Sequence, residues 1–248
     1  MFLRNLACFA ALGVAIWAQA PVLNGKFILA EENTSSATLG ILTFSATGSV
    51  AGTEYVQASG ITQAIEVTGN YIVAADGSGT LTLHTQVTTE DGLAPAVTAV
   101  YEFLSAKAGG FVAIRRDSSA ATLADILPAS TATGFTGAFL LADEGASPSG
   151  QAIAEIGLLT MKADGSLSGR VVVKQNSSSD TRTVDGSYIA DGQGFGTLKL
   201  TSPMAVDEDG GTALRTNTFV FLATAKQELI ALRTDNTMLG LARLTPLQ

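Results

Sequence analysis

The residues that could carry catalysis or bind a metal are few in this chain. Its single histidine is His84 and its single cysteine is Cys8. A zinc site needs several His or Cys ligands, and a serine nucleophile needs an imidazole that a third group orients. His84 also lies in an alternating segment on the same side as Thr80 and Thr82, where we expect it to meet water. The sequence predicts no catalytic residue, no metal site and no cofactor, and therefore a protein that is not an enzyme.

Acidic side chains gather beside glycine in two segments at matching places in the chain. These segments are Glu90-Asp91-Gly92 and residues 207–211, which read Asp-Glu-Asp-Gly-Gly. Several carboxylate oxygens could hold Ca²⁺, but the ligand spacing of an EF-hand is missing. Asp next to Gly is also typical of tight turns, so we expect solvated hairpin tips here.

Aromatic and arginine side chains are better candidates for a binding site, because they recur at matching positions in two halves of the chain. The alternation of residues along a strand points the aromatic side chains inward. Each arginine directly follows an apolar segment near the end of its half of the chain. In a hollow barrel these side chains would line a cavity for a small apolar ligand. In a filled barrel they would be core residues and structural ion pairs, with Arg115 beside Asp117 and Arg233 beside Asp235 on one strand face. The candidate ligand-binding residues are Tyr71, Phe103, Arg115, Tyr188, Phe221 and Arg233.

The elements that must position these residues are repeated. Residues 22–128 and 134–246 follow one pattern, and seven of thirteen positions are identical between Gly40–Gly52 and Gly157–Gly169. The run Gly-x-Tyr-x(5)-Gly-x-Gly-Thr-Leu-x-Leu also occurs twice, at Gly69–Leu83 and Gly186–Leu200. Self-similarity over this length indicates a duplicated structural unit.

Each copy reads as about eight short strands. Polar and apolar residues alternate, and Gly-containing turns such as Asp76-Gly77 and Asp191-Gly192 separate the runs. Strands joined in sequence order by tight turns can close into an up-and-down barrel without exposed edges. The sequence predicts an all-β protein of two tandem antiparallel barrels: a signal-peptide helix at 1–20, a first barrel at 21–128, a linker at 129–133 and a second barrel at 134–248.

Two segments, residues 111–114 and 228–232, are apolar on both strand faces. A strand of this kind must be covered on both sides. We expect the other copy to provide the cover, packed about a pseudo-twofold axis. A merged sheet shared by the two copies is the structural alternative.

The N-terminal segment has the pattern of a secretory signal peptide. Arg4 precedes an apolar run from Leu6 to Trp17, which is shorter than a membrane span, and Ala18-Gln19-Ala20 is a small-x-small cleavage site. We expect a secreted protein, extracellular or periplasmic, with no stable membrane insertion after cleavage. Without Arg4 the chain has 13 basic and 22 acidic residues, and this acidic balance with no basic stripe argues against nucleic acid as a partner.

The repeat resembles a known superfamily at a few positions. Gly25-x-Phe27 opens one copy and Arg115 lies late in it, and Gly137-x-Phe139 with Arg233 repeats this arrangement. The pattern resembles the calycins, the lipocalin and avidin type of barrel, in which a basic residue covers a Gly-x-Trp tryptophan; here Phe replaces Trp. The resemblance implies a barrel with room for an apolar ligand and no catalytic residue. The Gly-x-Tyr run is also similar to one in secreted bacterial proteins of uncharacterised function, notably acidobacterial ones.

Two functions follow from these features. The first is a secreted, non-enzymatic binding protein that holds a small apolar ligand in a barrel. The second is an extracellular structural or surface protein that acts through self-association or packing on a partner, as the two-faced apolar strands suggest. Short strands and few aromatic residues argue against an outer-membrane barrel.

Overall fold

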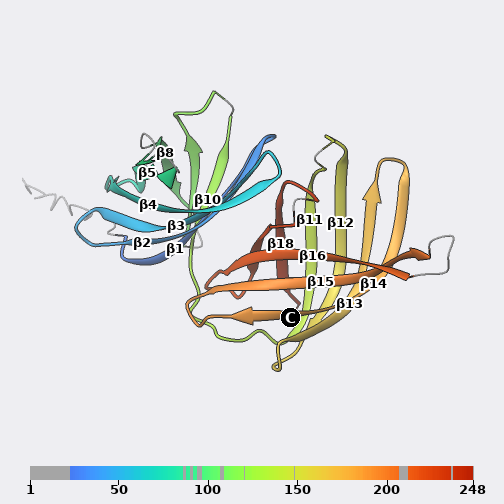
Figure 1. Ribbon diagram of the computed structural model, residues 1–248. Helices are drawn as coiled ribbons and strands as arrows, with labels where there is room; N and C mark the ends of the chain where they lie inside the picture. Colours follow the sequence, from blue (N-terminus) through green and yellow to red (C-terminus); the bar gives the residue numbers. More distant parts are fainter. Residues whose placement is uncertain are drawn as a thin grey trace, which may run out of the picture.

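The protein is built from two closed antiparallel barrels in tandem (Figure 1). The computed structural model describes residues 23–85, 88–89, 92–93, 97–106, 109–119, 121–147, 149–206, 212–235 and 237–247. No helix occurs among them, so none is long and apolar enough to cross a membrane. The expected signal peptide and the acidic clusters at Glu90-Asp91 and 207–211 lie outside the described residues.

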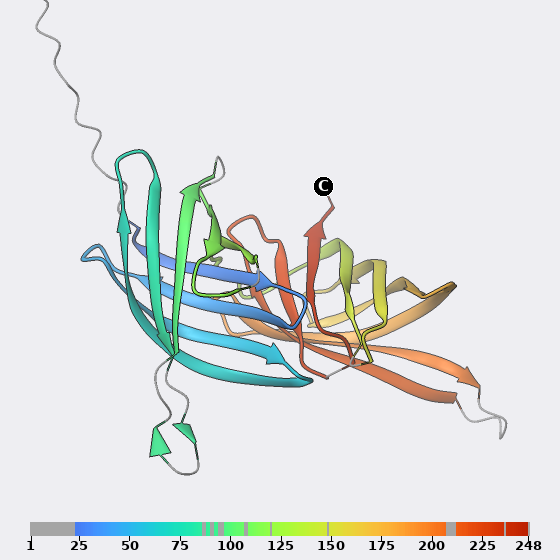
Figure 2. The same ribbon diagram turned by 90° about the horizontal axis from the view of Figure 1, so that it is seen from above.

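Each barrel has eight strands in sequence order, as the repeat predicts. The first barrel consists of β1 (Gly25–Glu32), β2 (Ser36–Phe44), β3 (Ser49–Ala58), β4 (Ile61–Val73), β5 (Ser78–Thr85), β8 (Val97–Ser105), β9 (Phe111–Arg115) and β10 (Leu123–Pro128). The second consists of β11 (Gly137–Ala146), β12 (Ala152–Met161), β13 (Ser166–Gln175), β14 (Ser178–Ala190), β15 (Phe195–Val206), β16 (Thr212–Ala223), β17 (Leu229–Arg233) and β18 (Leu241–Pro246). Two short strands, β6 (Thr88–Thr89) and β7 (Gly92–Leu93), pair with each other away from the first barrel (Figure 2).

Local sequence accounts for the strands and their turns. In β12 every second side chain is buried, and the alternation runs through the whole strand. The hairpin turns use glycine where the backbone is left-handed, with φ of 84° at Gly77 and 81° at Gly165. The ladders β1–β10 and β11–β18 close the two barrels, so each sheet has no free edge.

The interior of each barrel is a packed apolar cluster. In the first barrel the cluster extends from Leu23 to Ile126, and in the second from Phe135 to Leu244. The predicted inward orientation of the aromatic residues is confirmed, because Tyr71, Phe103, Tyr188 and Phe221 are all buried there.

A third apolar cluster joins the two barrels. We call its first-barrel side the β2 face, which is the outer surface of β1–β3 and carries Ile28, Leu39, Ile41 and Tyr55. Its second-barrel side is the β17 face, the outer surface of β16–β18, which carries Leu222, Ile230, Leu232 and Leu241. In Figure 1 the two barrels lie side by side along this contact, and β2 lies against β16 and β17.

The contact corrects one expectation and confirms another. Residues 228–232 are covered by the other barrel, as predicted, because Ile230 and Leu232 are fully buried in the joint cluster. The same prediction is wrong for residues 111–114, since Val112 and Ile114 are exposed. The barrels contribute different strands to the contact, so the expected pseudo-twofold packing is wrong. Each sheet also closes on itself, which excludes the merged sheet.

Candidate functional sites

An aromatic cluster fills one end of the first barrel. Phe44 contacts Phe27 and Tyr71 edge to face, with ring centroids 5.2 and 5.1 Å apart, and Phe103 packs on Phe111 at 5.1 Å. The Tyr71 hydroxyl lies 2.5 Å from the carbonyl oxygen of Leu23 and 2.8 Å from that of Ser45, and it donates its hydrogen to these acceptors. Burial raises the pKa of Tyr71. The hydroxyl therefore links the segment before β1 to the turn after β2 at this end of the barrel.

The second barrel repeats this arrangement. The Phe135 ring packs against Tyr188 at 6.1 Å and against Phe221 at 5.8 Å. Tyr188 Oη donates toward the carbonyl oxygens of Phe135, at 2.6 Å, and Lys162, at 2.9 Å, and it accepts from the amide of Phe135. Four of the six candidate ligand residues are thus packed against other aromatic rings, and the two tyrosines among them are also hydrogen-bonded to backbone.

A charged cluster occupies the other end of the first barrel. Arg115 pairs with Asp117 at 3.0 Å, as the sequence predicts, and also with Glu31 at 3.2 Å. Tyr101 donates to the other oxygen of Glu31 at 2.5 Å. Glu54 is buried nearby, and this burial raises its pKa to about 7; the Glu31 carboxylate acts in the same direction and Arg115 in the opposite one.

The second barrel holds a more deeply buried version of this cluster. Arg233 Nη2 donates to Asp143 at 2.5 Å and to Glu155 at 2.9 Å, and all three side chains are shielded from solvent. The expected partner Asp235 instead accepts from the amide of Thr218. Burial raises the pKa of Asp143 to about 6, although the Arg233 guanidinium lowers it. Such a group is stable only when its charges are mutually compensated.

The structure does not bring the six candidate residues together. Tyr71 with Phe103, and Tyr188 with Phe221, lie in the aromatic clusters, whereas Arg115 and Arg233 lie in the charged ones. Each guanidinium covers a ring from the neighbouring strand, Arg115 over Tyr101 at 5.9 Å and Arg233 over Phe219 at 4.9 Å. The expected cover over the first-strand phenylalanine is therefore wrong, because Phe27 lies among the rings of the opposite end.

Sequence reasoning missed the buried acids, although a signal was present. Glu31 follows Phe27 and Leu29 at two-residue spacing, and Asp143 follows Phe139 and Leu141 in the same way. This spacing places the carboxyl on the inward face of the strand. A charged residue in phase with core residues is the pattern that predicts a buried ion pair.

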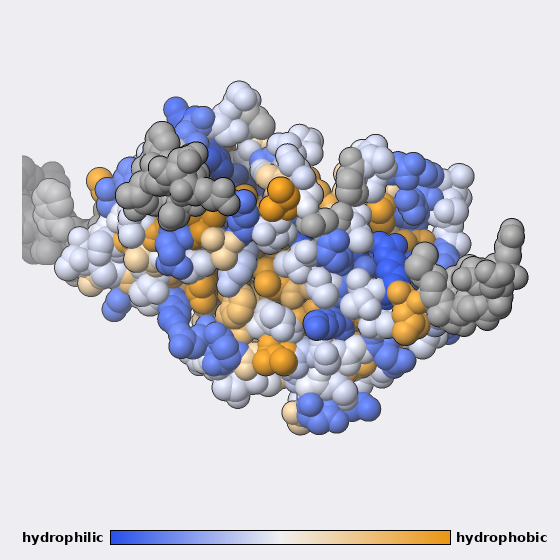
Figure 3. Space-filling model, in the orientation of Figure 1, coloured by the Kyte–Doolittle hydropathy of each residue, from blue (hydrophilic) through white to orange (hydrophobic). Residues whose placement is uncertain are grey.

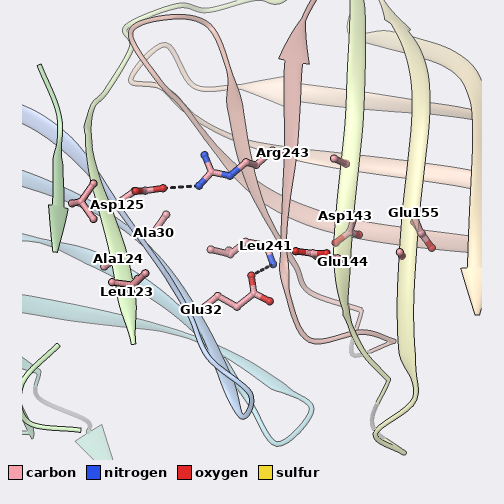
Figure 4. Close-up of a pocket in the computed structure, with 13 residues that line it drawn as sticks. Ala30, Glu32, Leu123, Ala124, Asp125, Asp143, Glu144, Glu155, Leu241 and Arg243 are labelled. Atoms are coloured by element: carbon pink, nitrogen blue, oxygen red, sulfur yellow. Dashed lines mark hydrogen bonds and ion pairs between the residues drawn. The ribbon is translucent and has the colours of Figure 1, made fainter. Parts of the chain in front are cut away.

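A cleft of about 570 Å³ lies between the barrels (Figure 4). Glu32 reaches across it from the first barrel and accepts from the amide of Leu241 at 3.3 Å, and burial raises its pKa. Asp125 and Arg243 form an ion pair of 2.7 Å between the barrels. Asp143 and Glu155 also line the cleft, but their carboxylates are already held by Arg233. Apolar side chains of both barrels line the rest of the cleft, and Val112 and Leu123 of the first barrel are among them.

The outer surfaces carry two further apolar faces. The β12 face is the outer surface of β11–β13, with Leu140, Ile156, Leu158 and Val172 exposed. The β9 face is the outer surface of β8–β10, with Leu104, Val112, Ile114 and Leu123 exposed. The β9 face borders a groove of about 560 Å³ that Ile72 and Phe103 also line. Apolar residues reach the surface of both halves of the molecule in Figure 3.

Reactive groups are scarce in the part of the chain that the structure describes. No group of three or more His, Cys, Asp or Glu side chains there is arranged to hold a metal ion. His84 lies on the outside of β5, and its Nδ1 is 3.1 Å from the hydroxyl of Thr98. No protein-family model matches the chain, and no curated protein matches it either.

Proposed function

We propose that this protein is a non-enzymatic structural protein of the cell exterior, extracellular or periplasmic, that works by packing its outer apolar faces on a macromolecular partner. One observation carries the proposal: large apolar side chains are exposed together on the β12 and β9 faces, whereas the barrel interiors are filled. Contiguous exposed apolar surface on a soluble protein marks interaction sites.

The chemistry of the two faces supports a protein or similar surface as partner. Aliphatic side chains on paired strands present a preorganised surface, which reduces the entropy lost on docking. Charged residues neighbour the β9 face on the sheet, since Glu102 pairs with Ile114 and Asp125 with Val112. The net charge of −8 makes the protein a poor match for nucleic acid.

An apolar ligand inside a barrel, with Tyr71, Phe103, Tyr188 and Phe221 as its walls, stays a prediction. The calycin-like spacing of Gly25-x-Phe27 and Arg115 supports it. Binding there requires these rings to leave the contacts that fill the barrel end. Opening a packed core costs free energy, and this cost opposes ligand binding.

Oxidative footprinting on the native material tests the proposed function. Hydroxyl radicals label exposed aliphatic side chains, so in the secreted material or envelope of the source cells Leu104 and Ile156 should be several-fold less labelled than in dilute purified protein. Ile189, an exposed isoleucine of β14 outside both faces, is the control and should be labelled equally in both states. Equal labelling of Leu104 and Ile156 in the two states would overturn the proposal.

A further inference from the structure

The contact between the two barrels defines a specific pairing of faces. The β2 face of the first barrel covers the β17 face of the second, and Leu39 of the former and Ile230 of the latter are both fully buried. Tyr55 stacks on Phe195 at 5.3 Å beside them. The contact joins two different surfaces, so it is heterologous.

The repeat places a second copy of each of these surfaces on the other barrel. The β12 face holds the positions equivalent to the β2 face: Leu140 for Ile28, Ile156 for Leu39, Leu158 for Ile41 and Val172 for Tyr55. The β9 face holds those equivalent to the β17 face: Leu104 for Leu222, Val112 for Ile230, Ile114 for Leu232 and Leu123 for Leu241.

All eight positions keep a large apolar residue, yet they are exposed. Leu39 is 0% exposed and its equivalent Ile156 is 54% exposed; Leu232 is 0% exposed and its equivalent Ile114 is 51% exposed. The chain thus pairs one β2-type face with one β17-type face and leaves one of each uncovered.

We propose that the partner is a second copy of this chain, whose β9 face docks on the β12 face of the first copy in the same way that the barrels dock within one chain. This inference rests on the proposed function and names its partner. Because the contact is heterologous, each added copy again offers one free face of each type. Head-to-tail association then continues as a filament or closes as a ring.

Polar contacts at the rim fit the same pairing. Asp125 and Arg243 occupy equivalent positions of the repeat and pair across the barrels. In the head-to-tail contact Arg243 of one copy, which is already paired with Asp125 of its own chain, would also face Asp125 of the next copy, so opposite charges still meet. Glu144 stands in the place of Glu32, and would accept from the amide of Leu123 as Glu32 accepts from that of Leu241.

The contact between copies should be weaker than the contact within the chain. The stacked pair Tyr55 and Phe195 is replaced by Val172 and Ser78, which removes an aromatic contact. The barrels of one chain are also tethered, whereas two copies must meet by diffusion. Association should therefore depend on protein concentration.

Sedimentation velocity on the protein recovered from a secreting host tests the inference. The average mass should rise between about 1 and about 100 μM, a range that covers weak and moderate dissociation constants. Ile156→Lys on the β12 face and Ile114→Lys on the β9 face should each weaken association about tenfold or more, because each buries a charge in the contact. Ile189→Lys, the same change outside both faces, should associate like the parent protein.

Mixing the two face variants gives the sharpest readout. Ile156→Lys retains a working β9 face and Ile114→Lys a working β12 face. At a concentration at which each variant alone is monomeric, the mixture should form a complex of two copies and nothing larger. Both changes add a lysine, so no new ion pair can produce the complex. All three positions are exposed, and circular dichroism should show the parent fold for every variant.

A parent protein that stays monomeric at about 100 μM, or a mixture that does not associate, would overturn the inference. If Leu104 and Ile156 are nevertheless protected in the native material, the proposed function stands and the partner is another macromolecule. If they are not protected either, both proposals fail.

Discussion

Each barrel keeps ionisable side chains inside an apolar interior, at the end opposite to the cluster that contains Tyr71 or Tyr188. In the second barrel Arg233 pairs with both Asp143 and Glu155, whereas in the first barrel Arg115 pairs with Glu31 and Asp117. Glu54 forms no ion pair with the described residues, and one of its buried oxygens has no hydrogen-bond partner among them. Burial, and to a smaller extent the nearby Glu31 carboxylate, raise its pKa to about 7.

At the residue scale we predict that Glu54 makes the protein less stable as the pH rises. Between its ordinary pKa of 4.5 and about 7 the folded state holds a proton that the unfolded state has lost. The free energy of unfolding therefore falls through this window and is level above it. In the parent protein Glu54 should lower the free energy of unfolding by on the order of 2 kcal/mol between pH 5 and pH 8, and Glu54→Gln should abolish this decrease. Urea unfolding at the two pH values measures this, and an unchanged pH dependence in the variant would contradict it.

At the element scale, close approach of neighbouring strands depends on glycines that no turn requires. A Cβ on Gly69 in β4 would lie 1.9 Å from the carbonyl oxygen of Thr82 in β5, and one on its repeat equivalent Gly186 would lie 1.9 Å from that of Lys199. The two strands can keep their register only without a side chain at this position. The Gly-x-Tyr repeat in the sequence thus has a backbone cause, and the following Tyr71 and Tyr188 hold the barrel ends.

The corresponding prediction is that Gly69→Ala destabilises the protein by roughly 2 kcal/mol or more, because strand backbone must move apart. Gly134→Ala is the matched control: a Cβ there meets nothing within 4 Å, so its effect should stay within about 0.5 kcal/mol. Urea unfolding of both variants measures the two changes in the free energy of unfolding. Equal effects would show that the β4–β5 approach tolerates a methyl group.

At the scale of the whole molecule, the duplication places identical types of surface in different environments. Leu39 and Ile156 occupy equivalent positions on β2 and β12, but only Leu39 is covered by the other barrel. The domain contact therefore gives the β2 face a role in stability that its repeat lacks within one chain.

We expect Leu39→Ala to lower the free energy of unfolding by about 2–4 kcal/mol, since it removes fully buried side-chain volume. Ile156→Ala, measured at a concentration too low for association, should change it by no more than about 0.5 kcal/mol. Chemical denaturation at low micromolar protein is the measurement. A large effect of Ile156→Ala under those conditions would mean that its face is covered within the chain.

Much of this arrangement follows from the sequence by itself. The repeat, the alternation of apolar residues and the turn glycines predict two closed barrels of eight strands, because strand direction and turn geometry are local properties. Inward aromatic residues such as Tyr71 and Phe221 follow from the same alternation.

Only the tertiary structure decided which outward apolar faces are covered. Val112 and Ile230 have equivalent positions and similar side chains, yet one is exposed and the other is buried. The tertiary structure also decided that Arg233 pairs with Asp143 and Glu155, and that the barrel contact is asymmetric. Alternation tells which side of a strand a residue takes, but cover depends on contacts between distant segments, and two copies of one pattern cannot indicate which face of each will meet the other.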